Sequence, residues 1–152
     1  MVRHDRIRLA VILAGGFALA SCGSDASSDD AAPDLSQPAV RVQLADASRT
    51  LAKQLNVAQP ATMMAVATTD HQVAEAAISG AVLNEHDPVY VVQMTGGTFT
   101  ALHHPHGQDF PTGTVLTVTY DAKTMRITDV GFDTVAPDLH AIDTNVVDLM
   151  AP

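Results

Sequence analysis

Three of the seven histidines lie together in one short segment, at His103, His104 and His106. Imidazole nitrogens are common protein ligands of Zn²⁺ and Cu²⁺, and two histidines with one residue between them on an extended segment can reach the same ion. His86, followed by Asp87, and Asp109 would add ligands if their loops met this segment. A proline stands at position 105, however, and spacing alone does not complete a coordination shell. We therefore expect an exposed polar loop and no cofactor, with a Zn²⁺ or Cu²⁺ site as the alternative.

Other side chains offer little for catalysis. The chain has no Gly-x-Ser-x-Gly motif and neither of the glycine motifs that bind phosphates, GxGxxG and GxxxxGK(S/T). Four carboxylates are spread along the C-terminal region, at Asp129, Asp133, Asp138 and Asp143. Unless two of them converge on one cleft, they are expected to be solvated. An enzyme is therefore not expected.

The only cysteine of the chain, Cys22, follows a short hydrophobic segment. Residues 1–8 are basic, and residues 9–20 are apolar and uncharged. Twelve helical residues extend for about 18 Å, whereas the hydrocarbon core of a bilayer is about 30 Å thick. The pattern predicts a signal for export rather than a helix that spans the membrane.

The residues at the end of this segment, Leu19-Ala20-Ser21-Cys22, resemble the bacterial lipobox. The resemblance implies that residues 1–21 are a signal peptide, that cleavage occurs before Cys22, and that its thiol carries a lipid. A lipidated Cys22 would hold the protein on the outer face of the cytoplasmic membrane. The alternative is a secreted protein with an unpaired thiol, which is a liability in an oxidising compartment.

The charge of the chain restricts its partners. The formal net charge is −9, and residues 1–21 hold three of the eight basic residues and one of the seventeen acidic residues. The remainder is therefore strongly acidic, which argues against nucleic-acid binding and against attachment to anionic lipids without an anchor. Residues 22–40 are rich in Ser, Asp, Ala and Pro, and they are expected to form a flexible tether behind the lipid.

Residues 41–152 are expected to form one small domain that begins with helices. Apolar residues share one face of a helix predicted over residues 40–55, which Asn56 and Pro60 would end. A short strand is predicted over residues 61–68. A second helix is predicted over residues 70–79, with Thr69 as its N-cap in a capping box and Gly80 near its C-terminus.

The second half of this domain is predicted to be β. Strands are expected over residues 89–94, 98–103, 114–120 and 125–132, with a turn at Gly96-Gly97, a loop over 104–113 and a turn over 121–124. Residues 143–150 predict a short helix or a closing strand. The order indicates an α+β fold, in which one or two helices pack on one face of a mainly antiparallel sheet of three to five strands.

Two segments of this half, PVYVVQM and TVLTVTYDAKTMRITDV, resemble the PepSY-type pattern over roughly residues 72–132. The chain departs from the pattern at Met125, which replaces a turn glycine; a bulky residue is disfavoured at positive φ, so a different turn is expected. The segments VYVVQ, TGxFT and GTVLTV also resemble a group of small actinobacterial lipoproteins. The PepSY resemblance implies regulation or binding of extracytoplasmic proteins and supplies no catalytic residue.

These observations together predict a lipid-anchored extracytoplasmic protein. Its expected role is non-catalytic binding of an envelope protein or peptide, through an exposed edge strand that accepts an extended segment. Its expected contact with the membrane is the lipid on Cys22. The alternative is a metal-binding lipoprotein that uses the His103–His106 loop.

Overall fold

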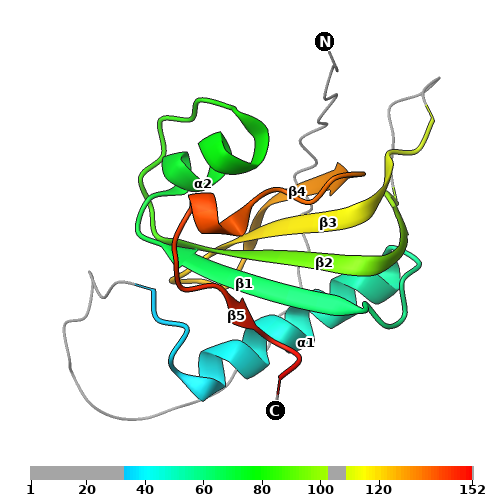
Figure 1. The fold of residues 1–152 in the computed structure, drawn as a ribbon, viewed down its shortest axis with the longest axis horizontal. Coiled ribbons are helices and arrows are strands. Elements are labelled where there is room, and N and C mark those ends of the chain that lie inside the picture. Colours follow the sequence, from blue (N-terminus) through cyan, green and yellow to red (C-terminus); the bar gives the residue numbers. More distant parts are fainter. Residues whose placement is uncertain (1–32, 103–108, 152) are drawn as a thin grey trace.

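The computed structural model describes residues 33–102 and 109–151. Its helices are α1 (Pro38–Gln54), α2 (His71–Ser79) and the single-turn η1 (Leu139–Ala141). Its strands are β1 (Thr62–Thr68), β2 (Val89–Thr100), β3 (Thr112–Asp121), β4 (Ile127–Asp133) and β5 (Val147–Asp148). The strands form one antiparallel sheet in the order β4-β3-β2-β1-β5 (Figure 1). This arrangement confirms the predicted α+β class.

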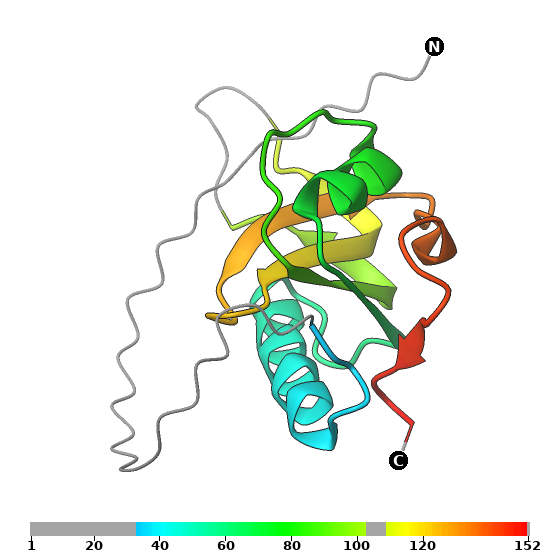
Figure 2. The same ribbon diagram turned by 90° about the vertical axis from the view of Figure 1, so that its left-hand side faces the viewer.

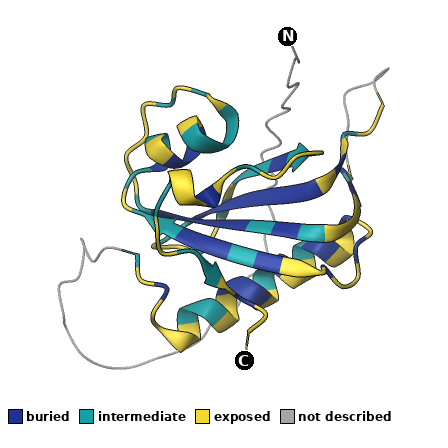
Figure 3. Ribbon diagram, in the orientation of Figure 1, coloured by how far each residue is buried: buried dark blue, intermediate teal, exposed yellow. Residues whose placement is uncertain are grey.

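The first layer of the core lies between α1 and the sheet. Leu44 and Ala52 of α1 are fully buried against alternate residues of the strands, such as Met63, Val92 and Val118. Helix α1 is fastened to β3 by a buried hydrogen bond of 2.9 Å between the hydroxyls of Ser48 and Tyr120. The core is deepest under the central strands, where buried residues dominate β2 and β3 (Figure 3).

The second layer lies on the opposite face of the sheet. Ala74 of α2 and Leu139 of η1 pack against Val66, Val89 and Val91, whose side chains point away from α1. Figure 2 shows α1 and α2 on opposite sides of the strands. The expected packing of helices on one face therefore holds for α1 alone. Helix α2 lies on the other face because β1 and β2 are apolar on both sides, so each side needs a cover.

The folded part begins earlier than the predicted boundary at residue 41. Leu35 is buried in the first layer, the Asp34 backbone is hydrogen-bonded to the Tyr90 hydroxyl, and α1 starts at Pro38. Proline suits the first turn of a helix because its φ is fixed and its missing N–H is not needed there. The last residues of the predicted tether, 34–40, thus belong to the domain. Neither of the longer helices in the described part has the length and apolarity that crossing a bilayer requires.

Two local predictions for helix ends and turns are corrected by the structure. The N-cap of α2 is Asp70 rather than Thr69, because the Asp70 carboxylate accepts a hydrogen bond from the Gln72 N–H at 2.9 Å. Gly80 follows the helix in the left-handed conformation, with φ 68°, as predicted. At the β3–β4 turn, Met125 adopts a φ of 57° despite its side chain, so the missing glycine does not prevent that conformation.

The pair Gly96-Gly97 does not form a turn. Strand β2 continues through both glycines, and its register against β3 shifts between Thr95 and Phe99, as at a β-bulge. Gly96 has a φ of 106°, and a side chain there would come within 2.3 Å of the Ala61 backbone nitrogen. The glycines therefore allow the chain before β1 to approach β2 closely. The closing strand predicted as one option for residues 143–150 is present as β5.

Candidate functional site

Strand β4 forms one edge of the sheet, and the direction of its backbone groups can be assigned. The Ala122 N–H donates to the Pro88 carbonyl across 2.9 Å, so even-numbered residues of β3 pair with β2. The odd-numbered residues Thr117 and Thr119 therefore turn their backbone groups toward β4. Their partners in β4 are Gly131 and Asp129, respectively.

The alternate residues of β4, Val130 and Phe132, consequently turn their N–H and C=O groups to the outside of the sheet. Their side chains pack against the α1 core, whereas those of Asp129 and Asp133 project on the α2 face. The Val130 N–H is already engaged, because it donates to the Asp129 Oδ1 at 2.7 Å. The outward groups of Phe132 and the Val130 carbonyl have no strand beyond them in the described part of the chain.

Asp129 also faces Glu75 from α2, and the two carboxyl groups lie close enough for Asp129 to raise the pKa of Glu75. Glu75 is only 3% exposed. Burial raises the pKa of Glu75 and the nearby Asp129 raises it further, while the Ser79 hydroxyl and the His71 imidazole oppose the rise. The Ser79 hydroxyl lies 3.1 Å from the Glu75 Oε2. The raised pKa favours the protonated form of Glu75, which reduces the repulsion between the two acidic groups at the junction of α2 and the edge strand.

Two buried polar atoms on this face have no hydrogen-bond partner in the described residues. They are the Nε2 of His71 and the Oγ1 of Thr117. The other ring nitrogen of His71, Nδ1, lies 3.1 Å from the Glu85 Oε2. Thr117 is 3% exposed and stands next to Gly131 in the ladder, where no side chain covers it from β4. Orphaned buried polar groups are rare in native proteins and demand an explanation.

Only some of the predicted site residues lie in the described part of the chain. Cys22, His103, His104 and His106 lie outside the described residues, so lipidation and the histidine loop stay predictions. His86 lies beside Asp70, with its Nδ1 3.2 Å from both carboxylate oxygens, and its side chain is 66% exposed. This hydrogen bond is the main reason why the pKa of Asp70 lies below its usual value. The residues described contain no group of three His, Cys, Asp or Glu that could hold a metal ion.

The interpretation of all four C-terminal carboxylates as solvated is wrong for Asp129. Asp138 and Asp143 do cap exposed turns, by accepting from the backbone of His140 and Asn145. Glu75, the partner of Asp129, was missed in the sequence. A signal existed, because His71 and Glu75 are four residues apart and therefore share the face of α2 that carries Ala74 and packs on the sheet.

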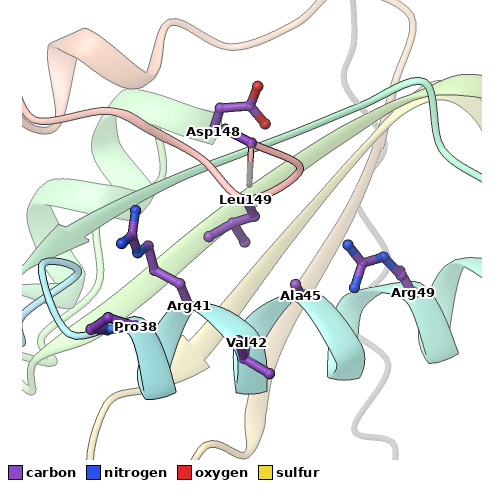
Figure 4. A pocket seen from close by; sticks show the side chains of 8 residues that line it. Pro38, Arg41, Val42, Ala45, Arg49, Asp148 and Leu149 are labelled. Atoms are coloured by element: carbon purple, nitrogen blue, oxygen red, sulfur yellow. The ribbon is translucent and has the colours of Figure 1, made fainter.

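A separate shallow groove of about 200 Å³ lies between α1 and the residues after β5 (Figure 4). Arg41 and Arg49 rise from α1 on either side of it, and Leu149 closes its floor. Arg49 is paired with Asp46 at 3.1 Å, and both side chains are well exposed. Such exposed pairs contribute little to binding or stability. This groove borders the other edge of the sheet, away from β4.

Comparison of the chain with protein-family models, with curated proteins and with solved structures found no match. The resemblance to PepSY-type domains therefore stays a prediction. Function has to be inferred from the geometry of the chain itself.

Proposed function

We propose that this protein is a lipid-anchored extracytoplasmic binding module that receives an extended segment of an envelope protein or peptide as a sixth strand on β4. The observation that carries the proposal is the position of β4, a seven-residue edge strand with outward backbone groups at Val130 and Phe132. Strand addition uses such groups for affinity and the neighbouring side chains for specificity.

The two edges of the sheet differ in a way that supports binding at β4. On the opposite edge, β5 pairs with Met64 and Ala65 of β1, and the Leu149 N–H then donates to the Met63 carbonyl at 2.8 Å. Natural edge strands are commonly protected by lysine, proline or a covering segment. Strand β4, with the sequence ITDVGFD, contains neither residue. Two features limit the pairing of a further strand with β4. One is the register shift near Thr128, and the other is the Asp129 side chain, which accepts from the Val130 N–H.

The anchor part of the proposal rests on the sequence around Cys22 and on the short tether. With the folded part starting near residue 34, about twelve residues separate the lipid from the domain. A flexible chain of that length spans about 20 Å on average. The domain would therefore stay near the membrane surface, where its partners are envelope components.

Photo-crosslinking in living cells tests strand addition at β4. A benzoylphenylalanine residue is placed at Thr134, an exposed position just beyond β4, and in a matched strain at Val82, which is 88% exposed in the loop after α2. We expect an adduct with one defined partner segment from position 134 and none from position 82. Amide exchange in the purified complex should then show slower exchange of the Phe132 N–H.

Two results would contradict the proposal. One is an adduct that forms equally from both positions, because that indicates a non-specific encounter. The other is a defined partner whose binding leaves the Phe132 amide unprotected, because the segment would then lie elsewhere. The anchor is checked separately by the intact mass of the native protein, which must lack residues 1–21 and carry acyl chains on Cys22.

A further inference from the structure

We propose that the groove between α1 and the residues after β5 binds a segment of the same chain, residues 23–32, with the Asp25 carboxylate at Arg49 and the Asp29 carboxylate at Arg41. This groove is called the α1 groove below, and residues 23–32 are called the acidic segment. The acidic segment precedes the described part of the chain, which begins at residue 33. The inference goes beyond strand addition at β4 and does not depend on it.

The α1 groove offers two cations above a shallow apolar floor. Figure 4 shows Arg41 and Arg49 rising from the same side of α1, with Leu149 pointing down toward the helix between them. The two arginines are eight residues apart in one helix, so they are separated by about 12 Å along its axis. The volume of about 200 Å³ lies below the range of about 300–1,000 Å³ that is usual for small-molecule pockets. A chain with small side chains fits such a groove better than a compact ligand.

Both guanidinium groups have donors left for a further carboxylate. Arg41 forms no ion pair with a described residue, and Arg49 uses its Nη1 for Asp46 at 3.1 Å. A guanidinium has five N–H donors, and an exposed pair of this kind is easily exchanged. The other acidic residue at the groove, Asp148, turns its carboxylate away from α1 and accepts from the Met150 N–H at 2.8 Å. It therefore leaves the space between the arginines to another carboxylate.

The acidic segment, GSDASSDDAA, matches the groove in charge and in spacing. It contains three aspartates and no basic residue, and Asp25 and Asp29 are four residues apart. In an extended chain this spacing is about 13 Å and places both side chains on one face. It is close to the separation of about 12 Å between the two arginines. Ser27, the residue between the two aspartates on that face, is small enough for the shallow floor.

The connection between the acidic segment and α1 is long enough for this placement. Helix α1 begins at Pro38, which lines the groove near Arg41. Five residues lead from Asp29 to Asp34, the start of the folded part, and they extend for up to about 17 Å. The chain can therefore turn back over the first turn of α1 and run antiparallel to the helix. Asp29 then meets Arg41, and Asp25 reaches the far end of the groove.

Covalent attachment favours the chain's own segment over a separate anionic partner. Residues 1–21 hold three of the eight Lys and Arg residues, and three of the remaining five, Arg41, Arg49 and Lys53, lie on α1. Elsewhere this acidic chain repels a negatively charged segment or peptide. A segment joined by a short linker has a millimolar effective concentration, so a contact with a dissociation constant of about 1 mM is already half populated. Two exposed ion pairs are sufficient for that.

Docking has a consequence for the anchored protein, and this consequence alone rests on the proposed function. Cys22 precedes Asp25 by three residues, which extend for about 10 Å. A docked acidic segment therefore holds the α1 side of the domain close to the bilayer. Strand β4, at the other edge of the sheet, stays open to partners.

Paramagnetic broadening of amide signals measures the contact in the full-length chain. The chain carries Cys22→Ser and Ser27→Cys, so that its single thiol takes a nitroxide and the result does not depend on lipidation. Spectra are recorded in a zwitterionic detergent at low salt. We expect the strongest broadening in the described part at Val42 and Leu149, which line the groove. It should disappear in about 1 M NaCl, where the screening length is about 3 Å.

Matched variants remove the same number of charges at different places. Arg41→Gln with Arg49→Gln should reduce the broadening at the groove at least about threefold, as the loss of a contact populated by half or more requires. Lys123→Gln with Arg126→Gln removes two positive charges at the β3–β4 turn and should change nothing.

Variants in the acidic segment test the same contact without a change in the folded domain. Asp25→Asn with Asp29→Asn should cause the same loss of broadening as the two arginine variants. Asp25→Arg and Asp29→Arg, combined with Arg41→Glu and Arg49→Glu, exchange the charges and should restore it.

Several results would overturn the inference. Broadening that survives both arginine variants, or that the Lys123 and Arg126 variants reduce equally, shows that the arginines do not hold the segment. Broadening between a nitroxide-bearing chain and a separate isotope-labelled chain shows that the groove receives a second copy. If the arginine variants instead abolish adsorption to phosphatidylglycerol vesicles, with the broadening unchanged, the groove serves a membrane surface. None of these results concerns β4 or the lipid, so the proposed function stands or falls by its own experiments.

Discussion

At the residue scale, the Glu75–Asp129 pair joins two elements that lie far apart in the sequence. Two carboxyls in contact cannot both ionise without repulsion, and Glu75 has little access to water. Protonation of Glu75 therefore favours the contact between α2 and the edge strand. Among the described residues, His71 on the same helix also acts on the charge of Glu75.

The first prediction concerns the pH dependence of stability. Because the pKa of Glu75 in the folded protein is raised above its ordinary value of 4.5, the folded state binds more protons than the unfolded chain between these two values. The contribution of Glu75 to the free energy of unfolding is then greatest below pH 4.5. It is lost as the pH rises through the pKa of Glu75 in the folded protein. Glu75→Gln, which keeps a donor for Asp129, should therefore be stabilised relative to the parent at pH 7.5 but not at pH 4.

Thermal unfolding of both proteins at pH 4, 5, 6 and 7.5 measures this difference, and comparison at each pH cancels the other acidic groups. Asp46→Asn, an exposed change on α1, should show no such trend. A constant gap between Glu75→Gln and the parent across this range would show that the pKa of Glu75 is the same in the folded and the unfolded chain.

The second residue-scale prediction concerns the buried hydroxyl pair of Ser48 and Tyr120. Burial raises the pKa of Tyr120 to about 12, so its hydroxyl stays protonated at any physiological pH. Tyr120→Phe or Ser48→Ala leaves one buried hydroxyl without a partner and should lower the free energy of unfolding by about 1–3 kcal/mol. The double variant should lose less than the sum of the single losses, as urea denaturation can show; strict additivity would mean that the two hydroxyls do not interact.

At the scale of elements, β2 depends on a backbone conformation that only glycine adopts easily. Gly96 and Gly80 both have positive φ, but a side chain at Gly96 would meet Ala61, whereas the space around Gly80 is open. Gly80→Ala should cost about 1 kcal/mol for the left-handed backbone alone. Gly96→Ala adds the clash with Ala61 and should cost several times more. Equal losses in urea denaturation would contradict the close approach of the chain before β1 to β2.

The same pair of glycines shows where prediction from the sequence ends. Helix α1, strand β1, helix α2 and strand β3 were predictable because their apolar residues repeat with helical or strand periodicity over nearby positions. Gly96-Gly97 also looks like a turn locally, and its role as a bulge depends on Val57 and Ala61, some forty residues earlier. The local sequence pattern gives no information about contacts between residues so far apart in the chain.

The candidate site was less predictable than the elements for the same reason. An exposed edge strand was expected, but the identity of the edge requires the strand order, which long-range pairing decides. Glu75 and Asp129 are 54 positions apart, and neither position is unusual in its own segment. At Met125, by contrast, a local preference is overridden by its surroundings. The turn at Asp121 and Thr124 imposes a left-handed conformation that the Met125 side chain disfavours.

At the scale of the whole molecule, the two faces of the sheet carry different charge. Helix α1 contributes three basic residues and one acidic residue, whereas the chain from His71 to Thr100 contributes acidic residues and no Lys or Arg. A lipid-anchored domain of this kind would be repelled by anionic lipid through its α2 side. We therefore expect that side, together with β4, to face away from the membrane toward soluble partners.

Strand β5 also has a consequence for assembly that reaches beyond one molecule. In the described part of the chain, β1 is covered on this side by the two residues of β5 and by the Leu149 N–H that follows them. Losing them would leave a subunit with two free borders that need not be related by symmetry. Subunits of that sort join head to tail without closure and grow into fibres. A chain that stops at Asn145, or the variant Val147→Pro, should therefore polymerise in sedimentation velocity runs. Adding Val130→Pro should return either one to a single sedimenting species, and polymers that ignore this second change would refute growth through β4.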